Sequence, residues 1–334
     1  MRSKKAFGKY VIMFSLLVFI SLCALRFGSV CLSAKDFYSA LFMRVGYETE
    51  SIIIYLVRLP RLLAALLAGV GLSVSGVLLQ NLTDNALASP NTIGVNAGAG
   101  LGAVLSMSAF FISSPFFMAS LNSFFAFMGA FLTTLFVLFL SYKAGGSKSS
   151  VILAGVAVTA VLNAAISVIT LIDSDILISY NAFSIGSFSG VKYGQLILPC
   201  IVISLCFILS ACLSRQIDVL CIGDGMAALT GVNIKLLRIC CILCASASAA
   251  SVVSFAGLLG FVGLVVPHIA RKIVGNSTKI LIFVSAIVGA IITASADLLG
   301  RIILAPSEIP VGIMMALIGV PFFIFIMFKK KGEY

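Results

Sequence analysis

The sequence predicts an all-α protein that crosses a membrane many times. Of its 334 residues, 61% are hydrophobic and only 10% are charged, and the mean hydropathy is +1.21. Soluble domains carry about 25% charged residues, so this composition excludes a soluble globular protein. Apolar runs of about 20 residues recur, long enough for a helix to cross the hydrocarbon core, whereas the alternating ten-residue segments of a membrane barrel do not occur.

About ten helical spans are predicted from the apolar runs and the breaks between them. They are expected near residues 10–28, 59–81, 92–111, 116–141, 150–172, 193–214, 236–256, 258–274, 279–299 and 311–328. The eighth is expected to be a short or broken helix, because Pro267, His268, Arg271 and Lys272 interrupt it. The first follows four basic residues like a secretory signal, but no small-residue cleavage site closes it, which favours an uncleaved span.

The distribution of charge predicts the orientation of the chain. With the N-terminus placed in the cytoplasm, the cytoplasmic breaks collect most lysines and arginines, and the outer breaks collect most acids. The whole net charge of +11 then falls on the cytoplasmic face, as the positive-inside rule requires. Both termini are expected to be cytoplasmic, and the excess charge is explained by topology and anionic lipid, with no nucleic-acid partner.

A weak internal repeat is visible in the sequence. The second and third spans meet at a proline in ASPNTIGV (Pro90), and the seventh and eighth are expected to meet at a proline in GLVVPHIA (Pro267). A helix rich in small residues precedes each junction. Because the copies lie five spans apart, they would have opposite orientations in the membrane, which is a common plan in transporters. A mere resemblance between small-residue helices is the alternative.

Three hydrophilic breaks are longer than tight turns: 27–50 and 171–192, expected outside, and 215–235, expected inside. In the third, Gly223 and Asp224 could begin a short helix, and Gly231, which tolerates a positive φ, could end it. A short amphipathic cytoplasmic helix is a natural docking element for a partner.

Two groups of polar residues flank the second span. Arg58 and Arg61 bracket a proline at its outer end, where they could anchor the helix at the interface or contact an acidic partner, together with Arg301. Asn81, Thr83, Asp84, Asn85 and Ser89 form a break at its inner end. This break could be a set of loop caps or a constriction of a pathway, since irregular backbone at membrane depth must be buried or line a cavity. Recurrent Gly and Ala on either side of the break predict close helix contacts.

No feature of the sequence supplies an energy source for transport. The acids nearest to spans, such as Asp84 and Asp297, lie at span ends, so no group for proton or sodium coupling stands out. The single histidine, His268, is expected to cap or hydrogen-bond. No phosphate-binding loop of the G-x-x-x-x-G-K-[ST] type occurs, so any ATPase must be a separate chain. Nine cysteines with one histidine do not favour a metal or redox site.

Four segments, in order along almost the whole chain, carry a resemblance to a known family. They are RLPRLLAALLAGVGLSVSGVLLQNLTDNALASPNTIGV, GDGMAALTGV, GLLGFVGLVVPHIAR and ADLLGRIILAPSEIPVGIMMALIGVPFFIFIM. With these the chain resembles the FecCD family, the permeases of bacterial ABC importers for iron–siderophore, haem and cobalamin. The resemblance implies one transmembrane domain over residues 1–334 with the type II ABC importer permease fold, in the bacterial plasma membrane.

The resemblance also implies partners. A second permease chain, identical or paralogous, would complete a central path, two ATPase subunits would bind ATP and Mg²⁺, and a periplasmic or lipid-anchored binding protein would deliver the ligand. This chain itself would bind no cofactor or metal and catalyse no covalent reaction.

Site residues follow from the matched motifs. The resemblance implies that Arg58, Arg61 and Arg301 receive acidic residues of the binding protein, and that Asn85, Leu87, Lys148 and Ser149 form a cytoplasmic gate. It implies ATPase coupling through the loop at about 215–235, with the matching positions Gly223, Asp224, Ala227, Leu229, Gly231 and Val232. The family break commonly reads N-P-L-A-[DE]-P, whereas this chain has Ala86 and Ser89 at the proline and acid positions, which leaves the local shape of the gate open.

The resulting hypothesis is an importer permease that moves an iron chelate by alternating access, with an Fe(III)–siderophore favoured over haem or cobalamin. An ion-coupled secondary transporter and a non-transporting membrane receptor or scaffold are the alternatives.

Overall fold

The computed structural model describes residues 2–30, 32–43, 46–108 and 115–330, and within these ranges it contains helices and no strands. The helices are α1 (Arg2–Arg26), α2 (Ala34–Leu41), α3 (Glu48–Ile52), α4 (Leu59–Thr83), α5 (Val95–Ser108), α6 (Pro115–Lys143), α7 (Lys148–Ile172), α8 (Ser174–Ile185), α9 (Tyr193–Ile222), α10 (Asp224–Leu229), α11 (Ile234–Ala256), α12 (Val262–Val274), α13 (Thr278–Ile302) and α14 (Val311–Lys330). A π-helical segment, Ile53–Arg58, leads into α4, and a 3₁₀ turn, Pro90–Ile93, precedes α5.

Each of the ten predicted spans coincides with a helix, although the ten are not equally long. Among the described residues, seven helices are long and apolar enough to cross a membrane, while α5 and the apolar part of α14 are shorter. The predicted short eighth span is confirmed, because α12 has only 13 residues. The last three residues of the predicted third span, 109–111, lie outside the described residues.

Three boundaries differ from the prediction. The seventh and eighth spans do not meet at Pro267, which lies inside α12; the break is at 257–261, where Gly257 and Phe261 both have positive φ. The break 171–192, predicted to lie outside, contains a helix, α8, which begins where the Asp173 side chain accepts hydrogen bonds from two backbone N–H groups. The first part of the expected loop 215–235 continues α9 to Ile222.

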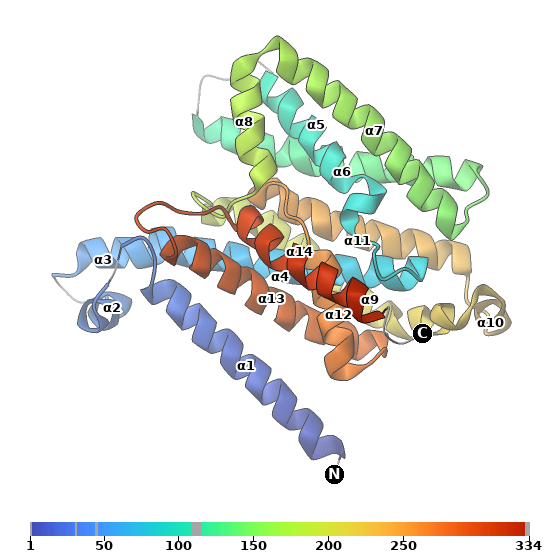
Figure 1. The fold of residues 1–334 in the computed structure, drawn as a ribbon, viewed down its shortest axis with the longest axis horizontal. Coiled ribbons are helices and arrows are strands. Elements are labelled where there is room, and N and C mark those ends of the chain that lie inside the picture. Colours follow the sequence, from blue (N-terminus) through green and yellow to red (C-terminus); the bar gives the residue numbers. More distant parts are fainter. Residues whose placement is uncertain (1, 31, 44–45, 109–114, 331–334) are drawn as a thin grey trace.

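Helix α4 is the centre of the fold. Most of its residues are buried, and it packs against α13, α11, α12 and α9. A helix that is apolar on all sides is typical of a protein core or a membrane span, and the span that contains α4 is the most buried of the long apolar helices in the described part of the chain. Helices α5 to α8 gather on one side of this centre, and α1 lies on the other side against α13 (Figure 1).

Glycines bring the central helices into backbone contact, as the small-residue pattern predicts. A side chain on Gly76 of α4 would collide with the carbonyl of Gly263 in α12, and one on Gly98 of α5 would collide with Thr133 and the backbone of Gly129 in α6. Such contacts let helices associate by close packing where no hydrophobic driving force exists between them.

The two chain breaks meet inside the bundle. A Cβ on Gly263, at the start of α12, would lie 3.2 Å from the Pro90 ring carbon Cδ, and the breaks enclose a cavity of about 120 Å³. Helix α5 leads from its break to the beginning of α6, whereas α12 ends beside the N-terminal part of the chain, where Lys9 donates to the Ile273 carbonyl oxygen. The two short helices therefore leave in opposite directions, as the inverted repeat requires.

Contacts between distant segments define two ends of the bundle. At one end, the Thr278 N–H donates to Asp218 over 2.8 Å, and Lys148 pairs with Asp84. At the other end lie Arg61 and Asp297. These groups are the same ones that the charge distribution assigns to the cytoplasmic and outer faces. The orientation of the two ends in a membrane remains a prediction.

Candidate functional site

The three arginines at the end of the bundle opposite to α10 lie together. Arg58 precedes α4, Arg61 is in its first turn, and Arg301 is near the end of α13. All three are buried, with exposed fractions of 4%, 6% and 3%. Arg58 Nη1 donates to the Leu25 carbonyl oxygen over 2.9 Å, and Arg301 Nη1 donates to that of Ala24 over 3.1 Å. The last carbonyl groups of α1 have no partner within their own helix, so these arginines cap it.

Two carboxylates neutralise part of this cluster. Asp297 of α13 is 2% exposed and accepts two hydrogen bonds from Arg61 Nε, over 2.9 and 3.1 Å. Asp297 also pairs with Arg301 over 3.2 Å, one helical turn away. On the loop before α14, Glu308 accepts a hydrogen bond from Arg61 Nη1 over 2.6 Å. A buried guanidinium is tolerated when its hydrogen bonds and its charge are both satisfied.

The environment of Glu308 changes its acidity. Its partial burial alone would raise the pKa, but the hydrogen bond and the charge of Arg61 outweigh this effect and hold the pKa of Glu308 below its ordinary value. Glu308 is therefore an anion at neutral pH, with a side chain that is 28% exposed. Sequence reasoning missed both acids as partners of the arginines; the i,i+4 spacing of Asp297 and Arg301 was the available signal.

At the other end of α4, the polar break is a folded turn. Asp84 ends the helix in the left-handed conformation, with φ of 51°. The Asn85 side chain then accepts a hydrogen bond from the Leu87 N–H over 2.9 Å, which closes an Asx turn and leaves the Leu87 side chain exposed. Ser89 caps the following 3₁₀ turn. The polar break therefore contains loop caps, which is one of the two roles predicted for it. The other role, a constriction of a pathway, stays a prediction.

The remaining gate candidates lie next to this turn. Lys148 begins α7, and its Nζ lies 3.9 Å from the Asp84 carboxylate; Ser149 follows in the same helical turn and is exposed. On the opposite side, Arg271 of α12 donates to Asn81 over 2.9 Å and also to Gln80. The structure thus brings Asn85, Leu87 and Lys148 to one place, and it adds Arg271, which sequence reasoning did not connect with the break.

The expected short helix is present between α9 and α11. Gly223 precedes α10 with φ of 140°, and Gly231 follows it with φ of 79°. The Val232 N–H donates to the Ala227 carbonyl oxygen, and the Gly231 N–H donates to that of Ala228. This pair of bonds is the Schellman motif, in which a glycine beyond the helix adopts the left-handed conformation. Ala227 is fully buried, while Leu229 is 83% exposed.

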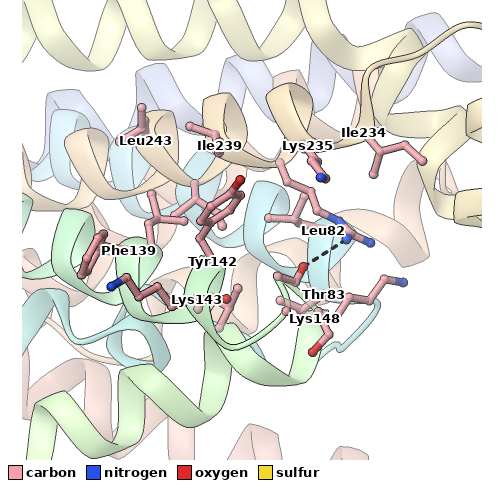
Figure 2. Close-up of a pocket in the computed structure, with 18 of the residues that line it drawn as sticks. Leu82, Thr83, Phe139, Tyr142, Lys143, Lys148, Ile234, Lys235, Ile239 and Leu243 are labelled. Atoms are coloured by element: carbon pink, nitrogen blue, oxygen red, sulfur yellow. Dashed lines mark hydrogen bonds between the residues drawn. The ribbon is translucent and has the colours of Figure 1, made fainter.

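An ion pair fixes the start of α10. Asp224, its first residue, accepts two hydrogen bonds from Arg238 of α11, over 2.7 and 2.8 Å. Both residues line a cavity of about 940 Å³ between α6, α11 and the end of α4 (Figure 2). All the predicted coupling positions therefore lie in or next to one compact helical turn at this end of the bundle.

Comparison with known proteins identifies the family. The model of the FecCD transport family matches residues 16–329. The chain belongs to this family. It is 34% identical over 324 residues to a permease protein of an iron(3+)-hydroxamate import system of Bacillus subtilis, which covers 95% of this chain and 96% of the relative. It is 30% identical to a hemin transport permease of Yersinia pestis (95% and 94% covered) and 32% identical to a vitamin B12 import permease of Vibrio cholerae (95% and 93%).

A solved structure has the same fold. It is described as an inward-facing conformation of a transporter of the metal-chelate ABC type, and it superposes with a TM-score of 0.83 at 30% identity, covering 98% of this chain and 99% of that one. The predicted type II ABC importer permease fold is thereby confirmed. The chain is an integral membrane protein of a family of iron-chelate ABC importer permeases.

Proposed function

We propose that this chain is the membrane-spanning subunit of an importer that carries an Fe(III)–siderophore complex from a binding protein into the cytoplasm. Relatives named for iron(3+)-hydroxamate, siderophore and Fe(3+)-citrate transport are 33–34% identical, compared with 30% for the hemin permease and 32% for the vitamin B12 permease. The proposal of a ferric siderophore rests on the names of the first three relatives, since the differences in identity are small. Two permease chains and two ATPases complete the assembly.

The observation that carries the proposal is the exposed α10. Leu229 projects from a six-residue helix that is held in place by Ala227, the Schellman turn and Arg238. Ile222 and Met226 are also exposed beside Leu229, and a group of exposed large apolar side chains is typical of a protein-binding surface. We assign this surface to the ATPase subunit, so that movement of the ATPase is transmitted to α9 and α11.

At the opposite end, Arg58, Arg61 and Arg301 are proposed to receive the binding protein. Because they are buried, an incoming carboxylate must compete with a partner that they already have. Glu308 is the more exposed of the two acids that Arg61 holds and lies on a loop, so we propose that docking displaces Glu308 while Asp297 keeps its place.

The path is proposed to close at the polar break. Asn85, Leu87, Lys148 and Ser149 of two permease chains would form the cytoplasmic gate, which opens and closes as the subunits alternate between outward- and inward-facing states. The weak Asp84–Lys148 pair, 3.9 Å apart, is at the surface and can separate at little cost.

The decisive experiment compares two glycines that have similar positive φ and open space around the Cα atom. Gly231 and Gly190 have φ of 79° and 75°, and a Cβ on either would meet no atom within 4 Å. Gly231→Val should abolish ATP-driven uptake of a ferric siderophore in proteoliposomes and the co-purification of the ATPase. Gly190→Val likewise places a β-branched residue at positive φ, at a cost of about 1–2 kcal/mol, at the opposite end of the bundle and should retain both.

Other outcomes would contradict the proposal. Normal ATPase binding by Gly231→Val would refute the coupling role of α10. Uptake driven by an ion gradient without any ATPase subunit would refute the importer itself and favour a secondary transporter. The substrate is tested separately by measuring whether the cognate binding protein retains a ferric hydroxamate, haem or cobalamin. If it prefers haem or cobalamin, the proposed ferric siderophore is the wrong substrate.

A further inference from the structure

The proposed transport mechanism leaves most of the cavity between α6 and α11 without a role. It measures about 940 Å³ and lies at the end of the bundle that holds α10. Figure 2 shows Phe139 on the α6 side and Ile239 and Leu243 on the α11 side, with Tyr142 between them. Leu79 and Leu82 of α4 form its inner wall.

Each helix presents one continuous stripe to this cavity. The stripe on α6 consists of Leu135, Leu138, Phe139, Tyr142 and Lys143, and the stripe on α11 consists of Lys235, Arg238, Ile239, Ile242 and Leu243. Both follow the i, i+3, i+4, i+7, i+8 spacing of a single helical face. Since α6 ends at this end of the bundle and α11 begins there, the cationic residues of both stripes lie at the same end of their helices, with the Lys143 ammonium turned back over the Phe139 ring.

The stripes therefore separate charge from apolar surface along the membrane normal. Eight residues of helix rise about 12 Å. Each stripe therefore extends about 12 Å from its lysine along the helix, which is long enough to contact the first part of a lipid acyl chain. Leu135, Phe139 and Ile239 line the cavity and are also exposed at the surface of the bundle. In a membrane, exposed apolar side chains of this kind would face lipid, and the cavity would open to the bilayer on that side.

The charged end of the cavity has an excess of positive charge. Lys143, Lys148, Lys235 and Arg238 line it, with Asp224 as the single acid of the lining. Arg238 and Lys148 have acidic partners, but no carboxylate in the described part of the chain lies within ion-pair distance of Lys143 or Lys235. Lys143 Nζ lies 5.2 Å from the centre of the Phe139 ring. Two ammonium groups thus remain for an anion.

From this arrangement we infer that the cavity binds an anionic phospholipid, with the headgroup at the cationic end and an acyl chain along the α6 and α11 stripes. A soluble phosphate would not require 12 Å of apolar wall, about eight helical residues long, and a neutral lipid would not require two unpaired ammonium groups. Basic pockets between helices at the cytoplasmic side bind acidic headgroups, with about 1 kcal/mol for each lysine or arginine near the surface. Because Arg238 also holds Asp224, the headgroup lies next to the support of α10.

Lipid retention by the full-length permease tests the inference. The protein is stripped with detergent, mixed with phosphatidylglycerol or phosphatidylcholine of identical acyl chains, and examined by native mass spectrometry. The wild type should retain phosphatidylglycerol preferentially. The double variant Lys143→Gln/Lys235→Gln should bind it about 30-fold more weakly. The control Lys272→Gln/Lys279→Gln removes two exposed lysines outside the cavity lining and should leave retention unchanged.

Three results would overturn the inference. One is equal retention of the two lipids by the wild type. Another is an equal loss of phosphatidylglycerol in the control variant, which would indicate a general charge effect. The third is displacement of the lipid by glycerol phosphate at equal concentration, or by added ATPase subunits, because the occupant would then be a soluble anion or an acidic protein segment.

Discussion

Gly69 of α4 and Gly289 of α13 each occupy the space into which a side chain of the other would extend. A Cβ on either residue would collide with the carbonyl group of its partner. The two helix backbones are therefore in direct contact, and this contact lies between the buried ion pairs at one end of α4 and the polar break at the other. Because closely packed interiors transmit strain, this contact couples the movement of α4 to that of α13.

Replacing Gly69 with alanine should destabilise the protein. In a helix without neighbours, the same change would stabilise by about 1 kcal/mol. Overpacking at Gly69 should instead cost about 1–3 kcal/mol and lower the thermal midpoint in a size-exclusion assay. Gly194→Ala on α9, where a Cβ meets no atom within 4 Å, is the matched control and should not lower the midpoint. Equal midpoints for the two variants would disprove the backbone contact.

Replacing Asp297 with asparagine should destabilise more than replacing Glu308 with glutamine. Asp297 is 2% exposed and serves two arginines, so its neutralisation leaves uncompensated buried charge, at a cost of about 3–5 kcal/mol. Glu308 is partly exposed and water can replace it. Thermal midpoints of both variants measure the difference, and the prediction fails if Glu308→Gln is the more damaging change.

The stability of the protein should fall in acid because Glu308 becomes protonated. Its pKa is lowered in the folded protein, so its contribution is complete above the unfolded value of about 4.3 and is lost as the pH falls further, through the folded pKa. Between about pH 6 and 4.3, the free energy of unfolding of Glu308→Gln should differ from that of the wild type by a constant amount. That difference should shrink at lower pH. A difference that grows in acid would contradict the assigned sign.

Glu308→Gln should also strengthen the docking of the binding protein. If an incoming carboxylate must displace Glu308 from Arg61, removal of the competing anion raises the affinity, most clearly at low salt, where charges are least screened. Surface plasmon resonance at two salt concentrations measures this. Unchanged affinity at low salt would reject displacement of Glu308, and a lower affinity would indicate that Glu308 itself contacts the partner.

Substitutions at Asp84 distinguish the effect of backbone strain from the effect of charge. Asp84 has φ of 51°, so Asp84→Gly and Asp84→Asn should be tolerated, whereas Asp84→Val should cost about 1–2 kcal/mol. Because the Asp84–Lys148 pair is exposed, loss of its charge alone should have little effect on the midpoint. Equal midpoints for the glycine and valine variants would contradict the left-handed cap.

The sequence predicted those features that depend on neighbouring residues. Apolar runs place the spans, and the glycines around residues 224–229 indicate α10, because both signals act within a few residues. It also indicated the small-residue contacts of α4. The helix α8 was missed because a polar break with Asp173 was interpreted as a loop, although aspartate is also a good helix cap.

Features that depend on distant residues were not predictable in this way. Nothing near Arg61 shows that its side chain turns inward to Asp297, and nothing near Lys143 shows that its stripe faces that of Lys235. A polar residue at a span end is compatible with the surface or the interior, and only the packing of α4, α13 and α14 decides between them. The docking, gating and coupling roles remain predictions.

The pair Arg61–Asp297 also has a consequence for the order in which the protein is made. The two residues are 236 positions apart. At translation rates of about 5–20 residues per second, α13 leaves the ribosome about 12–47 s after α4. During this interval the newly inserted α4 carries a guanidinium without its carboxylate, and its glycine face has no α13 to cover it. The centre of the fold is therefore completed among the last steps of biogenesis, and a chain that stops before α13 exposes its most buried helix to membrane chaperones and proteases.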